Sequence, residues 1–133
     1  MGTTPNVNVY IPTKEFFNSR AKPLTAVPTE QDTWYNKGGV DQFVIEVSGA
    51  EEIEATVEGC INLCDVNGNR LSVNERAFSA LKIIDLSTLT TTDEITKNGL
   101  YAVGVGGVAN IRINITALSG NVIIVGSTGS WEE

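Results

Sequence analysis

Apolar and polar residues alternate along most of this chain, and one alternating pattern occurs twice. Residues 43–57 read FVIEVSGAEEIEATV, and residues 101–115 read YAVGVGGVANIRINI. Each copy begins with an aromatic residue and carries a glycine, Gly49 or Gly107, at its centre. Two alternating runs on either side of a glycine corner predict an antiparallel hairpin with one buried face. The repeat has two interpretations, an internal duplication or convergent strand chemistry.

Turn signals divide the rest of the chain into further short strands. Asn67-Gly68 predicts a hairpin turn, and residues 119–121 predict the turn of a last hairpin. Residues 74–81 are expected to form a short helical turn or bulge before a strand at 82–86. About eight strands with no long helical pattern predict an all-β fold, an antiparallel β-sandwich or jelly roll.

The first 42 residues differ in composition from the rest and contain all four prolines. Alternation at 7–11 predicts a short edge strand that ends at Pro12, residues 15–18 could form a single turn, and residues 19–33 are expected to be an extended arm or long loop. A neighbouring subunit could order this arm, or it could wrap its own sandwich as an ordinary N-terminal strand.

Three segments are therefore expected within one domain. They are an N-terminal arm with an edge strand (1–42), a β-sandwich (43–126) and a polar C-terminal tail (127–133).

The charge balance restricts the partners that we expect. Asp and Glu total 16 against 9 Lys and Arg, which gives a formal net charge of −7. Nucleic-acid binding requires clustered basic residues, so we expect no nucleic-acid partner. No apolar run approaches the ~18 residues of a membrane-spanning helix, and no secretory signal precedes the domain. We therefore expect no membrane association.

The residue types needed for catalysis or metal binding are scarce. Histidine is absent, which removes the commonest general base and the Ser–His and Cys–His pairs. Cys60 and Cys64 lie too far apart along a continuous strand for a disulfide, so free thiols are expected. The carboxylates that could form a catalytic pair lie in turn-rich segments and are expected to be solvated: Glu51, Glu52, Glu54, Asp93 and Glu94.

A run of alternating oxygen-bearing residues, Asp65, Asn67 and Asn69, has some similarity to a calcium loop. Arg70 and Arg76 occupy the positions where such a loop requires Gly and Glu, so a plain Asn-Gly hairpin is expected instead. We expect no metal, no cofactor and no enzymatic activity.

Apolar and aromatic residues near the N-terminus are the candidates for partner binding. Trp34 and Tyr35 could stack on a sugar ring or anchor a neighbouring protein, or Trp34 could cap its own core. The full set of candidate partner-binding residues is Val7, Val9, Ile11, Phe16, Phe17, Trp34 and Tyr35.

The C-terminal half resembles a β-sandwich module of tailed-bacteriophage virion proteins. The stretch TKNGLYAVGV at 96–105, followed by IRINITALSGNVIIVG at 111–126, is similar to a strand "G-L-Y-x-V-x-V" that leads into "I-R-x-x-[IV]-T-A-x-x-G-x-V". Such modules occur in head fibres, in capsid decoration or cement proteins and in tail-fibre segments. The resemblance covers residues 96–126, about a third of the chain.

The resemblance implies a non-enzymatic structural protein of a virion, made in a bacterial host cytoplasm. Such proteins are usually trimeric or arrayed, so a homo-oligomer is expected, with a trimer favoured, in contact with a capsid or fibre protein. The alternative is a receptor-binding or carbohydrate-binding module of a phage fibre, for which a glycan is the partner.

Overall fold

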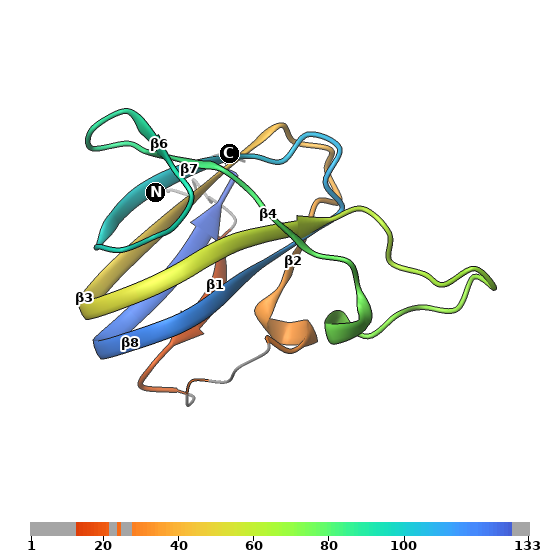
Figure 1. Cartoon of the computed structure of the whole chain (residues 1–133), viewed down its shortest axis with the longest axis horizontal. Helices are drawn as coiled ribbons and strands as arrows, with labels where there is room; N and C mark the ends of the chain where they lie inside the picture. Colours follow the sequence, from red (N-terminus) through yellow and green to blue (C-terminus); the bar gives the residue numbers. More distant parts are fainter. Residues whose placement is uncertain (1–12, 22–23, 25–27, 129–133) are drawn as a thin grey trace, which may run out of the picture.

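The fold is a single antiparallel sheet of eight strands in which two strands are much longer than the rest (Figure 1). The computed structural model describes residues 13–21, 24 and 28–128. The strands are β1 (Thr13–Asn18), β2 (Trp34–Tyr35), β3 (Gln42–Cys60), β4 (Ser79–Ala80), β5 (Ile83–Asp85), β6 (Thr90–Thr92), β7 (Gly99–Gly104) and β8 (Asn110–Ser127). Two 3-10 turns, η1 (Glu30–Asp32) and η2 (Val73–Glu75), are the helical elements of the described residues. The all-β antiparallel prediction is confirmed.

β3 and β8 pair along almost their whole length and divide the sheet into two halves. The strand order is β1-β8-β3-β7-β5-β6, while β2 joins β8 and β4 joins β3. Residues 42–48 of β3 pair with β7 and with the C-terminal part of β8, and we call this the first half. Residues 50–60 pair with the N-terminal part of β8 and with β4, and this is the second half.

The inward faces of both halves form one hydrophobic core. In β3 the buried side chains include Phe43, Ile45 and Val47 in the first half, and Ile53, Ala55 and Val57 in the second. Ile111, Ile113 and Ile115 of β8 face the second group, as their register with β3 shows. The period-two alternation of the sequence therefore marks the buried face correctly.

The two predicted hairpins are wrong, and the reason is the same for both copies. Residues 43–57 belong to one continuous strand, with Gly49 at a register shift rather than at a turn. In the second copy, β7 and β8 are separate strands, but β3 lies between them in the sheet. The predicted turn at 119–121 also lies inside a continuous strand, β8. Alternation with a glycine describes a bent strand as well as it describes a hairpin.

Three local predictions have different outcomes. The Asn67-Gly68 turn is confirmed, because Gly68 has φ 81° and Cys64 pairs with Arg70 across the loop. The short helical turn is also confirmed as η2, although Ser72 rather than Asn74 precedes it as the N-cap. The turn expected at 15–18 is wrong, since these residues belong to β1, which pairs with β8. No helix in the described ranges has the length and apolarity that crossing a membrane would require.

Candidate interaction surfaces

A buried arginine, Arg76, connects four parts of the chain. Its side chain is fully buried, and Nη1 donates to Tyr35 Oη and to Asn110 Oδ1, both at 2.9 Å. Nη2 lies 3.1 Å from Glu30 Oε2 and also donates to the Leu71 carbonyl, to which Nε donates as well. These contacts join η1, β2, η2 and the first residue of β8.

The Arg76 cluster is satisfied by the protein itself. A guanidinium has five N–H donors, and the five hydrogen bonds of Arg76 use all of them. Asn110 is equally buried and donates from Nδ2 to the Trp34 carbonyl at 3.0 Å. A buried charge with complete hydrogen bonding stabilises a fold and has no donor left for a ligand. We therefore assign Arg76 a structural role.

The sequence carried no local signal for this cluster. Glu30, Tyr35 and Asn110 lie more than thirty residues from Arg76 along the chain, and none of them forms a motif with it.

Trp34 and Tyr35 are half-buried residues of β2. Trp34 stacks on Phe43 with ring centroids 4.4 Å apart, and it packs against the core. The Tyr35 hydroxyl accepts hydrogen bonds from Arg70 at 2.6 Å and from Arg76, and both guanidinium groups lie over its ring. Both aromatic residues therefore already have contacts inside the chain.

The other candidate partner-binding residues fall into two groups. Phe16 and Phe17 of β1 are buried in the core, and Phe16 contacts Phe43 edge to face. Their side chains are covered by the chain itself, and partner binding through them stays a prediction. Val7, Val9 and Ile11 lie outside the described residues.

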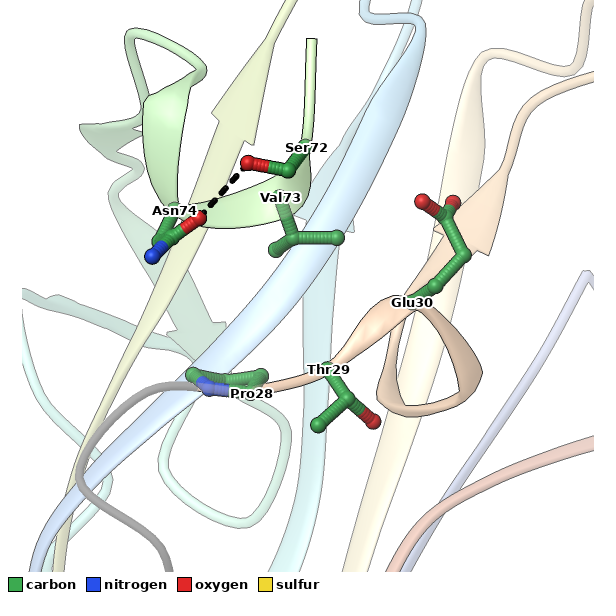
Figure 2. A pocket seen from close by; sticks show the side chains of 6 residues that line it. All are labelled: Pro28, Thr29, Glu30, Ser72, Val73 and Asn74. Atoms are coloured by element: carbon green, nitrogen blue, oxygen red, sulfur yellow. Dashed lines mark hydrogen bonds between the residues drawn. The ribbon is translucent and has the colours of Figure 1, made fainter.

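A depression of about 290 Å³ lies between the two 3-10 turns. Figure 2 shows Val73 pointing from η2 toward Pro28 and Thr29, next to the hydrogen bond between Ser72 and Asn74. Glu75 reaches back to the Ser72 backbone and side chain, and these hydrogen bonds lower the pKa of its carboxyl group. The polar groups of η2 are thus used to cap the turn.

A second depression, of about 410 Å³, lies beside Tyr35. Asn36, Lys37 and Arg70 line it together with Leu63 and Ala109. Arg70 is more than half exposed, and its charge is shared with Glu30 at 3.4 Å. Two cations beside an aromatic ring make this the depression whose lining best suits an acidic ligand.

The reactive groups that the sequence singled out are structural or solvated. Cys60 and Cys64 are free thiols, as predicted, and burial raises the pKa of Cys60. The carboxylates of Glu51, Glu52, Glu54, Asp93 and Glu94 are exposed, as expected. Asp65 Oδ1 accepts from the backbone N–H groups of Asn67 and Asn69, as in a plain hairpin turn. Within the described residues, no three metal-ligating side chains of the His, Cys, Asp and Glu types are grouped.

Asp85 is a further structural carboxylate, at the end of β5. Ser87 donates to it from its backbone and its hydroxyl, and Lys97 lies 3.3 Å away. These contacts lower the pKa of Asp85. Burial of the ring, together with the nearby charge of Asp85, raises the pKa of Tyr101. The group connects the β5–β6 turn to the residues just before β7.

The outward faces of the two halves differ in composition. In the second half the outward residues of β3 and β8 are Glu54, Thr56, Glu58, Arg112, Asn114 and Thr116. In the first half the outward positions carry polar residues, among them Gln42, Glu46, Ser48 and Ser127, together with six aliphatic residues, which we call the apolar face: Val44, Ile84, Leu100, Ala102, Ile123 and Val125. Ala102 is itself buried, at 2% exposure, and the other five lie outside the hydrophobic core cluster.

Comparisons with known proteins connect the fold to prophage proteins. No protein-family model matches the chain, and no curated protein matches its sequence. The SPBc2 prophage-derived protein YomS is similar in structure, with a TM-score of 0.60 and 14% identity over 91% of this chain and 94% of YomS. The PBSX exported protein XepA is similar with a TM-score of 0.59 and 17% identity, over 90% of this chain and 37% of XepA. The fold of this chain is thus that of phage-related proteins.

Proposed function

We propose that this chain is a non-enzymatic structural protein of a phage-related particle, of the capsid decoration, cement or head-fibre type. It acts by contacts with other copies of itself and with a shell or fibre protein. The observation that carries this proposal is the similarity to YomS, a prophage-derived protein whose fold matches nearly from end to end of both chains. The resemblance of residues 96–126 to virion modules points to the same class.

Two features of the molecule support a role in contacts. The apolar face leaves aliphatic side chains on the outside of an antiparallel sheet, where polar residues are usual. Around Tyr35, Arg70 and Arg76 donate hydrogen bonds to its hydroxyl group, and Arg70 also forms an ion pair with Glu30. The proposed function is therefore surface binding, in a particle assembled in the cytoplasm of the bacterial host.

Co-sedimentation tests this proposal. A tagged chain is produced in the host during particle formation, the particles are purified through a density gradient, and the chain is quantified by mass spectrometry. We expect the chain in the particle band at a constant ratio to the shell protein. The same chain produced without particles is the control for its own sedimentation. A chain that stays in the soluble fractions in both cases contradicts the proposal.

A second candidate function is favoured by the depression beside Tyr35. Lys37 and Arg70 in an acidic protein would suit an acidic sugar of a host surface. The test is binding to a glycan array, followed by Lys37→Ala, with Lys82→Ala on β5's side of the molecule as the matched control. Trp34 is a poor choice for this test, because its stacking on Phe43 would be lost together with any binding. Binding that only Lys37→Ala removes would favour this candidate.

A further inference from the structure

Leu89, in the turn between β5 and β6, has a backbone conformation that leucine rarely adopts. Its φ is 57°, and among the described residues it is the one residue other than glycine with a positive φ. Glycine has no Cβ and adopts this conformation without strain, whereas leucine does not. The other described positions with positive φ are all glycine: Gly39, Gly49, Gly68, Gly99, Gly107 and Gly120.

The hairpin turn at 65–69 shows what the β5–β6 turn would need for stability alone. Both turns begin with an aspartate, Asp65 or Asp85, whose Oδ1 accepts a hydrogen bond from the backbone N–H group two residues later. The carbonyl group of the same aspartate accepts from Gly68 at 3.0 Å in one turn and from Leu89 at 2.7 Å in the other. At the positive-φ position, one turn thus has glycine and the other leucine. The geometry of the turn gives no reason for the leucine.

The side chain of Leu89 adds nothing to the core that could offset this strain. It is 77% exposed, and it belongs neither to the core cluster nor to the partly buried residues packed against it. Figure 1 shows the turn before β6 projecting beyond the sheet. A single exposed leucine is ordinary on a protein surface. An exposed leucine in a strained conformation is not, because such strain is typical of sites that contact a ligand or a partner.

The residues around this leucine are uncharged, and several already have hydrogen bonds within the turn. Residues 87–92 contain no charged side chain, although the chain has a net charge of −7. The Ser87 hydroxyl donates to Asp85 at 2.7 Å, and the hydroxyl oxygens of Thr88 and Thr90 lie 2.6 Å apart. Removing water from uncharged groups that keep their hydrogen bonds costs little free energy. The turn therefore presents a surface that is easily buried by a partner.

We propose that Leu89 inserts into an apolar pocket of the shell protein of the particle, and that the neighbouring hydroxyl residues form the rim of this contact. The inference rests on the proposed function and names the part of the chain that holds it on the shell. Insertion buries the leucine side chain, while a turn already fixed by its own hydrogen bonds loses little entropy on binding.

Other partners fit the turn less well. Residues 87–92 have no aromatic ring on which a sugar could stack and no cation that could bind an anion. A second copy of the chain is also a poor partner. Its depressions of about 290 and 410 Å³ are lined in part by charged residues, Glu30 in the first and Lys37 with Arg70 in the second. Two chains of charge −7 also repel each other.

Titration of the purified chain onto particles produced without it tests the inference. Leu89→Asn and Leu89→Ala both remove the anchoring side chain, and each should raise the Kd for the particle by about 10-fold or more. Val66→Asn is the matched control. Val66 is 101% exposed at the tip of the other hairpin turn and has no positive φ, so its replacement should leave the Kd unchanged.

Urea denaturation of the isolated chain distinguishes an anchor from a structural residue. Leu89→Asn should raise the urea midpoint, because asparagine adopts positive φ more easily than leucine, whereas Leu89→Ala keeps the strain and should leave the midpoint nearly unchanged. A more stable chain that binds more weakly is the expected result, and it is one that a structural leucine would not give.

Four results would overturn the inference. They are an unchanged Kd for both Leu89 variants, an equal loss of binding in Val66→Asn, a lower urea midpoint for Leu89→Asn, and self-association of the wild-type chain that Leu89→Ala abolishes. If the wild-type chain binds particles and the Leu89 variants bind equally well, the proposed function stands without this contact. If the wild-type chain does not bind particles at all, the proposed function is contradicted together with the inference.

Discussion

Gly49 of β3 and Gly120 of β8 lie against each other where both long strands bend. Gly49 has φ 79° and Gly120 has φ 99°, values that residues with a side chain rarely adopt. The contact is also close, since a Cβ on Gly49 would lie 2.0 Å from the carbonyl oxygen of Asn121. The Asn98 side chain completes the bend by exchanging two hydrogen bonds, each of 2.9 Å, with the backbone of Ala50.

Alanine at Gly49 is expected to be more destabilising than alanine at Gly68. Gly68 has nearly the same φ, 81°, but its Cβ would meet no atom within 4 Å. Gly68→Ala therefore isolates the backbone strain, about 1 kcal/mol, whereas Gly49→Ala adds a clash with backbone atoms and should cost about 3 kcal/mol or more. Urea denaturation of both variants measures this. Equal losses would mean that the close contact at the bend is easily relieved.

At the scale of elements, side-chain hydrogen bonds hold the short segments that the sheet ladder holds weakly. β2 has two residues, and η1 and η2 have three each, so backbone pairing alone fixes them poorly. Figure 1 shows η1 and η2 next to each other at one side of the sheet, where Glu30 and Arg76 meet. The Arg76 cluster therefore orders a region in which little regular structure exists.

Removal of the Arg76 guanidinium should loosen that region. Arg76→Met leaves the buried Asn110 Oδ1 without its arginine donor, while Tyr35 keeps its hydrogen bond from Arg70, and we expect a loss of about 3 kcal/mol of unfolding free energy. Arg70→Met is the matched control, because Arg70 contacts the same Tyr35 and Glu30 from an exposed position and should cost about 1 kcal/mol or less. Thermal denaturation distinguishes them, with the fluorescence of Trp34 as a local probe in a Trp131→Phe background. Similar losses would contradict a special role for the buried guanidinium.

At the scale of the whole molecule, β3 and β8 run through both halves and share one core. Residues of the two halves belong to a single hydrophobic cluster, and β3 and β8 pair on both sides of the bend. Neither half therefore has a hydrophobic core of its own. The two halves differ in their flanking strands, β7, β5 and β6 in the first and β4 in the second, and in the outward aliphatic residues of the first.

We expect the two halves to unfold together. Ile45→Val in the first half and Ile113→Val in the second remove one buried methylene group each, and each should cost about 1 kcal/mol. Because the core is shared, each variant should shift one common transition, measured by circular dichroism and by tryptophan fluorescence. Two transitions, or probes with different midpoints, would show that the halves unfold separately.

The sequence alone identified the fold class, the Asn67-Gly68 turn and the free thiols, since each depends on neighbouring residues. The alternation of apolar and polar residues indicates which side chains share a face of the sheet. An Asn-Gly pair indicates the position of a turn, because glycine adopts positive φ without strain. Alternation does not indicate which strands are neighbours in the sheet. The pattern of residues 43–57 therefore fits a hairpin as well as it fits one bent strand.

Tertiary structure alone decided the rest. Gly49 bends β3 because Gly120 of β8 is its neighbour, and Arg76 is buried because Glu30, Tyr35 and Asn110 surround it. These partners are distant in sequence, so no local pattern reveals them. The apolar face likewise exists only when β5, β7, β3 and β8 lie side by side, because each strand contributes one or two aliphatic residues that would be unremarkable on their own.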